Sequence, residues 1–245
     1  PTITSTAITE ATEDQPYSYS FSAEDVDNDE VTLSVKDGTT LPSWLDFGSG
    51  SVTTEDFGDT VPGPGGVAID AEGNVYVVER FGSTIYKITP NGTTTAFATV
   101  SAGNKLGMLV VGNDLYISDV GMDVITKLDL TDPAAGAVDY ITSIEAPISM
   151  VEKDGFLYVA EYDAHKISRI DLSNASVTDY VTGTQWPFGL GFDSEGALFI
   201  SNLNGNGYLS KYENGVLTNN IISIGAPTDV KLDAEDNIYV STLGY

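Results

Sequence analysis

A short apolar unit with a central aromatic residue recurs along the chain at an almost constant interval. Its five copies are Val75-Tyr76-Val77, Leu115-Tyr116-Ile117, Leu157-Tyr158-Val159, Leu198-Phe199-Ile200 and Ile238-Tyr239-Val240. The central aromatics follow one another at steps of 40, 42, 41 and 40 residues. A period of this size is typical of supersecondary units that cannot bury their apolar faces alone, so neighbouring units must pack into a shared core. The repeat therefore constrains the architecture more than any other feature.

Each repeat divides into four short segments that favour β-strands. An apolar strand that starts with Pro or Gly, as at residues 187–192, is followed by a tight turn and then by the aromatic unit. The third segment places a basic residue among apolar ones, as at 167–170, and the fourth is more polar, as at 177–181. Four antiparallel strands in about 40 residues is typical of a propeller blade. Since no helical periodicity is present, the predicted fold class is all-β, a β-propeller with four full four-stranded blades and part of a fifth.

The sequence predicts a propeller over residues 51–245 and a short β segment over 1–50. Residues 51–57 align with the fourth strand at 176–181, so we expect a lone fourth strand that completes the last blade and leaves no sheet edge unpaired. The fifth unit has only two of its strands before Tyr245. We therefore expect a piece of a six-bladed ring within a larger multidomain chain.

The repeats resemble NHL-type propeller units. The pattern of that family runs Pro, Gly, an apolar strand, Asp, Gly-Asn, an aromatic strand, an acid and an apolar-basic strand. Residues 64–88 follow it closely and 187–212 and 226–240 follow it well, whereas 105–128 lacks the initial Pro. The resemblance covers about four-fifths of the chain. It implies a binding or scaffold propeller, with lactonase-like and lyase-like propellers as related enzymes.

The first 50 residues resemble the first half of a cadherin-like or Ig-like module of bacterial surface proteins. The matching pieces are residues 13–19, 23–29 and 41–45. A two-sheet sandwich of this kind takes roughly 100 residues, and the second half of the pattern is replaced here by the first propeller strand. The resemblance implies an extracellular or cell-surface location in a bacterium.

A run of alternating carboxylates lies within this first segment. Asp25, Asp27 and Asp29 offer the hard oxygen ligands that Ca²⁺ requires. The alternative interpretation is a solvated polar turn, because adjacent carboxylates also favour exposed loops. Ca²⁺ is the one cofactor that the sequence suggests.

The charge balance excludes several classes of partner. The chain has 36 Asp and Glu against 10 Lys and Arg, a formal net charge of −26. Nucleic acid and anionic lipid both call for a basic patch, so neither is an expected partner. No apolar run approaches the roughly 20 residues needed to span a bilayer, which argues against membrane insertion. The absence of Cys excludes disulfides and thiolate chemistry.

A polar residue follows each complete aromatic strand. Because antiparallel strands alternate in direction, the loops from second to third strand and from fourth to first strand should emerge at one edge of the blades. The four residues would then form a ring there, which a metal-dependent lactonase-like site could use. The candidate ligands are Glu79, Asp119, Glu161 and Asn202.

The alternative role for these acids is structural. A basic residue stands eight positions after each acid, which predicts repeated ion pairs within the blades. The predicted pairs are Glu79 with Lys87, Asp119 with Lys127 and Glu161 with Arg169. Under this interpretation the charges belong to the scaffold.

The same loops carry aromatic and polar side chains that could hold a ligand. Aromatic rings there could stack on a glycan or grip a peptide, or they could pack between blades. His165 is the only histidine, and without a Cys or a repeated Ser it cannot form a catalytic triad by itself. The candidate ligand-binding residues are Phe81, Tyr162, Asp163, His165, Trp186 and Asn204.

The expected function is therefore a non-catalytic surface module for binding or adhesion, with a protein or glycan ligand. The competing hypothesis is a metal-dependent hydrolase or lyase of the lactonase-like propellers. A metal bound by the acids of the ring would favour the second hypothesis, and acids engaged within the scaffold would favour the first.

Overall fold

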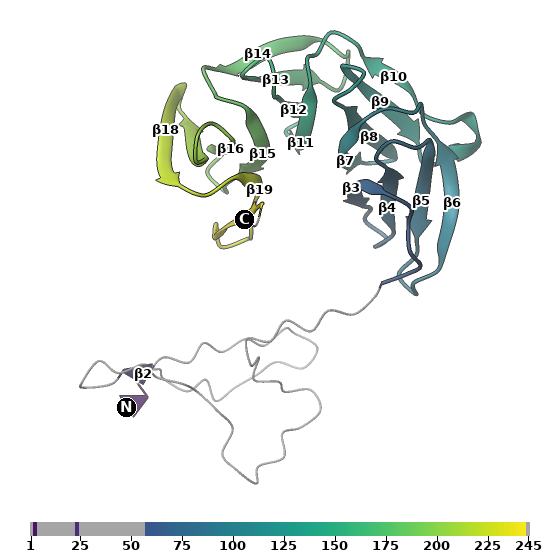
Figure 1. Ribbon diagram of the computed structural model, residues 1–245, viewed down its shortest axis with the longest axis horizontal. Coiled ribbons are helices and arrows are strands. Elements are labelled where there is room, and N and C mark those ends of the chain that lie inside the picture. The colour runs from purple at the N-terminus through teal and green to yellow at the C-terminus, as the bar shows by residue number, and fades with distance from the viewer. Residues whose placement is uncertain (1, 4–22, 25–56, 244–245) are drawn as a thin grey trace. The chain divides into compact units, whose positions relative to one another are not determined.

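The computed structural model describes residues 2–3, 23–24 and 57–243 (Figure 1). The chain divides into two compact units, Pro1–Glu55 and Asp56–Tyr245. In the first unit, β1 (Thr2–Ile3) and β2 (Ala23–Glu24) pair in antiparallel fashion. The calcium prediction on Asp25, Asp27 and Asp29 lies outside the described residues.

The second unit consists of four four-stranded antiparallel sheets and one two-stranded sheet, so the predicted all-β propeller architecture is confirmed. Each sheet is one blade, and its strands follow one another in sequence order. Blade 1 contains β3 (Pro64–Ile69), β4 (Val75–Glu79), β5 (Thr84–Ile88) and β6 (Thr94–Thr99). Blade 2 contains β7 (Lys105–Val111), β8 (Asp114–Asp119), β9 (Val124–Asp129) and β10 (Val138–Ile141), with the 3-10 turn η1 (Pro133–Ala135) before its last strand.

The remaining blades repeat this arrangement. Blade 3 contains β11 (Pro147–Lys153), β12 (Phe156–Glu161), β13 (Lys166–Asp171) and β14 (Val177–Thr182). Blade 4 contains β15 (Pro187–Phe192), β16 (Leu198–Asn202), β17 (Tyr208–Glu213) and β18 (Val216–Ser223). The fifth sheet contains β19 (Pro227–Leu232) and β20 (Ile238–Thr242). The five aromatic units all lie in second strands, as the repeat predicts.

The first strands of successive blades, β3, β7, β11, β15 and β19, lie next to one another around a common centre (Figure 1). Glycine permits this close approach. A Cβ atom at Gly107 in β7 would overlap the carbonyl oxygen of Ile148 in β11. The Ser118 hydroxyl also donates to the Ile148 carbonyl at 2.6 Å, which ties the second blade to the third.

The hydrophobic core is divided among the interfaces between blades. One face of each complete blade carries the central aromatic residue, and it packs against the opposite face of the next blade. Between blades 1 and 2, for example, Tyr76 and Val78 belong to the same buried cluster as Leu115 and Ile117. Since each interface buries residues of two blades, no blade forms its core alone.

In blade 1 and in the fifth sheet, the turn between the first and second strands contains an Asp that organises the backbone. Asp70 accepts hydrogen bonds from the Asn74 amide at 2.8 Å and from the Tyr76 hydroxyl at 3.0 Å. Asp233 does the same for Asn237, at 2.8 Å, and Tyr239, at 3.0 Å. The Asp therefore fixes both the turn and the aromatic ring of the following strand.

Two sheet faces at the ends of the blade series are exposed to solvent. Val67 in β3 is 60% exposed, and Tyr239 in β20 is also 60% exposed. Of the predicted lone strand at 51–57, residues 51–56 lie outside the described part of the chain, and Phe57 lies in no strand.

In the part of the chain that the structure describes, no helix is long and apolar enough to cross a membrane.

Candidate binding site on the loop face

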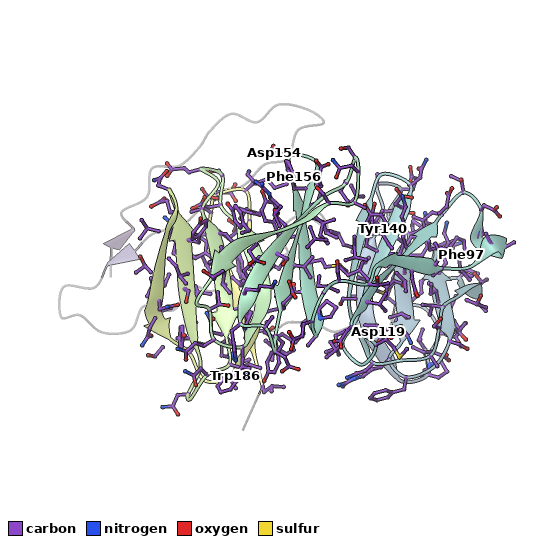
Figure 2. The ribbon with its side chains drawn as sticks, turned by 90° about the horizontal axis from the view of Figure 1, so that it is seen from above. Phe97, Asp119, Tyr140, Asp154, Phe156 and Trp186 are labelled. Carbon is purple, nitrogen blue, oxygen red and sulfur yellow. The ribbon has the colours of Figure 1, made fainter. Side chains whose placement is uncertain are left out.

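One edge of the blades gathers the loops that the sequence singled out, and we call it the loop face. It consists of the second-to-third strand loops, residues 80–83, 120–123, 162–165 and 203–207, and the connections between blades, residues 100–104, 142–146, 183–186 and 224–226. Backbone hydrogen bonds join the two sets, as from the Tyr162 amide to the Ala146 carbonyl at 3.0 Å and from Leu203 to Trp186 at 3.1 Å. Figure 2 shows Asp119 and Trp186 at this edge and Asp154 at the opposite one. The predicted placement of these loops on one face is confirmed.

In blade 1, the side chain of the acid at the end of the second strand points into the loop that follows it. Glu79 accepts hydrogen bonds from the amides of Ser83 and Thr84, both at 3.0 Å, and from the Tyr86 hydroxyl at 3.3 Å. Desolvation acts to raise the pKa of Glu79, but the hydrogen bonds from Thr84, Ser83 and Tyr86 outweigh it and lower the pKa. Glu79 therefore stays ionised as a cap for the loop backbone.

In the next three blades the equivalent side chain also ties the loop face together. Each one accepts a hydrogen bond from a backbone amide in the connection that precedes its own blade. Asp119 accepts from Asn104 at 2.9 Å, Glu161 from Glu145 at 2.8 Å, and Asn202 from Gln185 at 3.1 Å. These three side chains are buried, so each replaces water for a backbone N–H that would otherwise be unpaired.

The loop-face acids therefore hold backbone, and they are not gathered around a common point. Among residues 2–3, 23–24 and 57–243, no group of three or more His, Asp or Glu side chains is placed to bind a metal ion. Glu161 has the sole ion pair of the four ring positions in this part of the chain, with Lys166 at 3.5 Å. The side-chain oxygens at each of these positions are thus directed at the nearby loops and do not converge on a shared site.

The predicted ion pairs with the third-strand bases are wrong. Lys127 bonds Asp114 at 2.7 Å, and Lys87 lies over the rings of Tyr76 and Phe97 at 5.5 Å from each centroid. The reason is the hairpin register, which pairs Tyr76 with Lys87 and so places the base well inside the strand, away from the acid at its end. A basic residue in this position stabilises the aromatic face of the blade.

Lys105, the first residue of β7, is a buried charge beside the loop face and is not among the residues predicted from the sequence. Its ammonium group donates to the carbonyls of Gly82 at 2.8 Å and Ser101 at 3.0 Å. Burial lowers the pKa of Lys105, and the charges of Asp119 and Glu79 partly offset this effect. Lys105 pairs with Asp119 in the sheet, and the other blades have a proline at the position of Lys105. The missing proline in the repeat at 105–128 was therefore the sequence feature that could have identified Lys105.

His165 and Trp186 form a rigid corner between blades 3 and 4. Both residues have positive φ, 53° and 49°, which is uncommon for side chains of this size. The Trp186 amide donates to His165 Nδ1 at 3.0 Å, and the two rings meet edge to face at 5.3 Å. The histidine therefore serves as an acceptor that holds the tryptophan loop, and Trp186 remains 38% exposed.

The other predicted ligand-binding residues lie around this corner. Tyr162 meets Phe188 edge to face at 6.4 Å, Asp163 is exposed, and the Asn204 amide donates to the Gln185 side chain. Phe81 is further along the loop face in blade 1, is 67% exposed and lies beneath the Arg80 guanidinium at 5.0 Å. The structure thus places all six predicted residues on the loop face, with Phe81 in a different blade from the other five.

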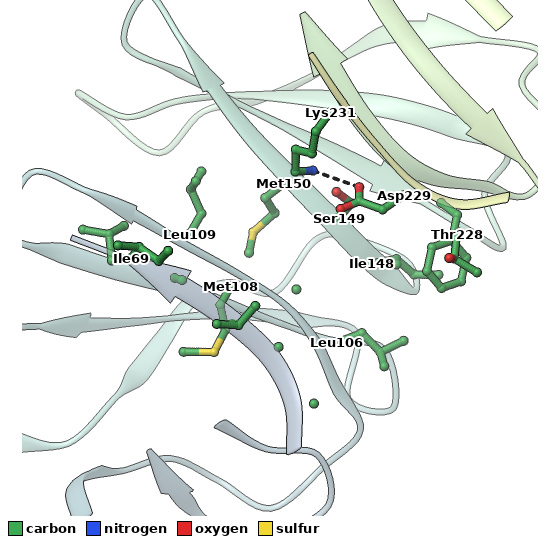
Figure 3. Close-up of a pocket in the computed structure, with 17 residues that line it drawn as sticks. Ile69, Leu106, Met108, Leu109, Ile148, Ser149, Met150, Thr228, Asp229 and Lys231 are labelled. Atoms are coloured by element: carbon green, nitrogen blue, oxygen red, sulfur yellow. Dashed lines mark hydrogen bonds and ion pairs between the residues drawn. The ribbon is translucent and has the colours of Figure 1, made fainter. Parts of the chain in front are cut away.

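One cavity borders Tyr162, and a second lies nearer the centre of the propeller unit. One of about 410 Å³ opens on the loop face between blades 3, 4 and the fifth sheet, with Tyr162, Asn206 and Leu243 in its lining. The other, of about 530 Å³, lies along the inner strands (Figure 3). Its lining is mainly apolar, and its two charged residues, Asp229 and Lys231, form an ion pair at 2.8 Å.

A protein-family model matches the first part of the chain. Residues 1–54 match the family described as "Putative Ig domain", which is 54 of 245 residues. No curated protein matches the chain.

Solved structures resemble the propeller unit. A gluconolactonase from Xanthomonas campestris is 17% identical with a TM-score of 0.63, over 76% of this chain and 72% of that one. Virginiamycin B lyase from Staphylococcus aureus is 17% identical with a TM-score of 0.60, over 73% of this chain and 62% of the lyase. A chain of a nidogen/laminin complex is 17% identical with a TM-score of 0.63, over 73% of this chain and 72% of that one. At identities this low, the likeness shows the β-propeller fold alone.

Proposed function

We propose that the propeller unit is a non-catalytic binding module that holds a protein or glycan ligand on its loop face. One observation carries the proposal. The acids Glu79, Asp119 and Glu161 on this face are engaged with loop backbone, whereas large apolar side chains on the same face are left exposed to solvent. The exposed side chains are Phe81 at 67%, Met122 at 60%, Leu243 at 54% and Trp186 at 38%.

Exposed aromatic side chains suit recognition because they bury much area on contact and lose little conformational freedom. Trp186 is already held by its hydrogen bond and ring contact with His165. A ligand that covers Trp186 would not have to order it first, so less of the binding free energy would be lost. The neighbouring cavity beside Tyr162 and Asn206 offers a ring and an amide, which glycans and peptides both use.

The setting of such a module would be extracellular, at a bacterial cell surface, within a longer multidomain chain. The match of residues 1–54 to an Ig-type family and the NHL-like repeat pattern support this proposal. The net charge of −26 supports a partner other than nucleic acid or anionic lipid. A calcium ion at Asp25, Asp27 and Asp29 remains a proposal for the first unit.

The alternative, a metal-dependent lactonase-like hydrolase or lyase, draws on the gluconolactonase and lyase among the similar structures. That likeness extends to the fold alone. The arrangement of Glu79, Asp119, Glu161 and Asn202 supports binding through the exposed side chains over this alternative.

The proposal can be tested with a glycan microarray and a panel of immobilised extracellular-matrix proteins, both probed with the complete 245-residue chain. The test variants are Phe81→Ala and Trp186→Ala. Val216→Ala is the matched control, because Val216 is a 62% exposed apolar residue at the start of β18, next to the turn from β17 at the opposite edge. We expect at least a tenfold loss of binding in one test variant and none in the control.

Binding that survives in a combined Phe81→Ala/Trp186→Ala variant would contradict a loop-face site. Turnover of δ-gluconolactone by the wild-type chain would instead favour the enzymatic alternative. Circular dichroism of each variant establishes that it remains folded.

A further inference from the structure

A hydroxyl group on the third strand of each complete blade occupies the same place in the hairpin. It stands opposite the third residue of the aromatic unit, so Tyr86 pairs with Val77, Ser168 with Val159 and Ser210 with Ile200. In blade 2 the corresponding pair is Thr126 and Ile117.

In three blades this hydroxyl bonds the polar residue that ends the second strand. Tyr86 donates to Glu79 at 3.3 Å, Ser168 donates to Glu161, and the Asn202 amide donates to Ser210 at 3.0 Å. These bonds satisfy the polar atoms between the blade faces, where an unpaired group costs free energy.

Blade 2 breaks the pattern. Asp119 is one methylene shorter than Glu79 or Glu161, and its Oδ1 is occupied by three backbone amides, those of Asn104, Gly121 and Met122, at 2.9–3.1 Å. As a carboxylate it has no N–H to donate, unlike Asn202. Thr126 is 3% exposed, and its hydroxyl has no hydrogen-bond partner within the described residues.

The residue with the unpaired hydroxyl, Thr126, lines a cavity. Thr126 lines a space of about 180 Å³ between the connection that follows blade 1 and the strands of blade 2, together with Ser101, Lys105, Asp119, Asp123 and Asp139. The volume corresponds to roughly six water molecules at about 30 Å³ each. A polar cavity of this size can admit a small solute or the end of a side chain.

The charges that line the cavity select for a cation. Three Asp residues face one Lys, and the Lys105 ammonium already donates to two backbone carbonyls. Asp123 uses one oxygen to accept from the Ala146 amide at 2.8 Å. Asp139 pairs with Thr126 in the sheet, and its side chain makes no hydrogen bond or ion pair with residues 57–243. The cavity therefore offers an excess of acceptors over donors, Thr126 included, which an ammonium group with its three N–H donors would satisfy.

We propose that this cavity is a binding site for a primary ammonium group, with Thr126 and Asp139 as direct acceptors. The site lies on the loop face beside Met122, but neither Phe81 nor Trp186 lines it, so it does not depend on those two aromatic side chains. The ammonium could belong to a free amine or to a lysine side chain of a partner.

The test uses the complete ¹⁵N-labelled chain in 150 mM NaCl, titrated with methylammonium chloride. The amide resonances of Asn104, Gly121 and Met122 report on the cavity because these groups donate to Asp119. We expect saturable shifts at millimolar concentration, and none with tetramethylammonium, which has the same charge but no N–H. Nα-acetyl-lysine N-methylamide is titrated in parallel: saturation with both probes assigns the site to lysine side chains, and saturation with methylammonium alone assigns it to free amines.

Two substitutions probe the acceptors. Thr126→Val keeps the shape and removes the hydroxyl, and we expect affinity for methylammonium to fall about tenfold, while Thr182→Val, at an exposed threonine, should leave it unchanged. Asp139→Asn should weaken binding at least threefold, whereas Asp154→Asn, which removes an equal charge at the opposite edge, should not.

A third substitution restores the pattern of the other blades. Asp119→Glu supplies the carboxylate length of blades 1 and 3, so it should reach Thr126, fill the cavity and abolish the response. An absence of saturable shifts in the wild type, equal shifts with tetramethylammonium, or unchanged affinity in Thr126→Val would each overturn the proposal. The Thr126→Val result decides the matter if Asp119→Glu fails to fold.

Discussion

Lys127 lies directly opposite Tyr116 in the second blade, with its ammonium nitrogen 5.8 Å from the centre of the tyrosine ring. The same nitrogen is 5.6 Å from the ring of Tyr140 on the fourth strand and 2.7 Å from an Asp114 oxygen. The hydrogen bond that Lys127 donates to Asp114 raises the pKa of Lys127, so the side chain is charged at neutral pH. A base between two aromatic rings is thus a stabilising part of the blade face.

We predict that Lys127→Met lowers the free energy of unfolding by about 1–2 kcal/mol, because it removes the cation and keeps much of the apolar stem. Lys231→Met should cost less than about 0.5 kcal/mol, since Lys231 is 63% exposed and its ion pair with Asp229 is on the surface. Urea denaturation followed by circular dichroism measures both values. Equal stability of Lys127→Met and the wild type would show that the repeated base does not stabilise the blade.

A second prediction concerns the close approach of the inner strands of blades 2 and 3. A Cβ at Gly107 would overlap the Ile148 carbonyl, which is backbone and cannot rotate away. We expect Gly107→Ala to destabilise the protein by about 1–3 kcal/mol through overpacking.

Gly225→Ala is the matched control, because nothing lies within 4 Å of a Cβ at that position. The thermal midpoint of Gly225→Ala should stay close to that of the wild type. If Gly107→Ala also melts with the wild type, the inner strands of blades 2 and 3 are further apart than the structure places them.

The Asp in the turn between first and second strands predicts a pH dependence. Desolvation acts to raise the pKa of Asp70, but hydrogen bonds from Asn74 and Tyr76 outweigh it and hold the pKa below its ordinary value of 3.8. A carboxyl with a lowered pKa in the folded state stabilises that state above the unfolded pKa, and this contribution is lost as the pH falls through the folded value.

The stability advantage of the wild type over Asp70→Asn should therefore be full at pH 6 and shrink as the pH falls below about 4. Urea midpoints of the two proteins at several pH values measure this difference. An advantage that stays constant down to pH 2, or that grows, is the result that this assignment does not permit.

The sequence was sufficient to predict the blades, the strand order and the loop face. The period of the aromatic units determines these features, because each unit must occupy the same place in its sheet. The predicted ion pairs were wrong for a reason that spacing does not reveal. The four-residue loop at 162–165 sets the hairpin register so that Glu161 pairs with Lys166. Arg169 is three residues further along the strand and therefore lies opposite Tyr158.

The candidate sites were only partly predictable. The exposed positions of Phe81 and Trp186 follow from their place in loops, but the bond between His165 and the Trp186 amide depends on two residues with positive φ. The buried Lys105 could have been found from the proline missing at its position. The unpaired Thr126 hydroxyl could not have been found from the sequence, because Thr126 and Ser168 are both hydroxyl residues at the same repeat position. They differ only in whether the acid at the end of the second strand, Asp119 or Glu161, is long enough to reach the hydroxyl.

The most direct measurement for the central claim, that the loop-face acids hold backbone and do not bind metal, is calcium titration by calorimetry. The wild type is compared with a Glu79→Gln/Glu161→Gln variant, which keeps one acceptor oxygen for the backbone amides at each position and removes two charges. We predict the same calcium stoichiometry in both proteins, whether zero or set by carboxylates of the first unit. Loss of a calcium site in the double variant would contradict the claim and favour a metal-dependent propeller enzyme.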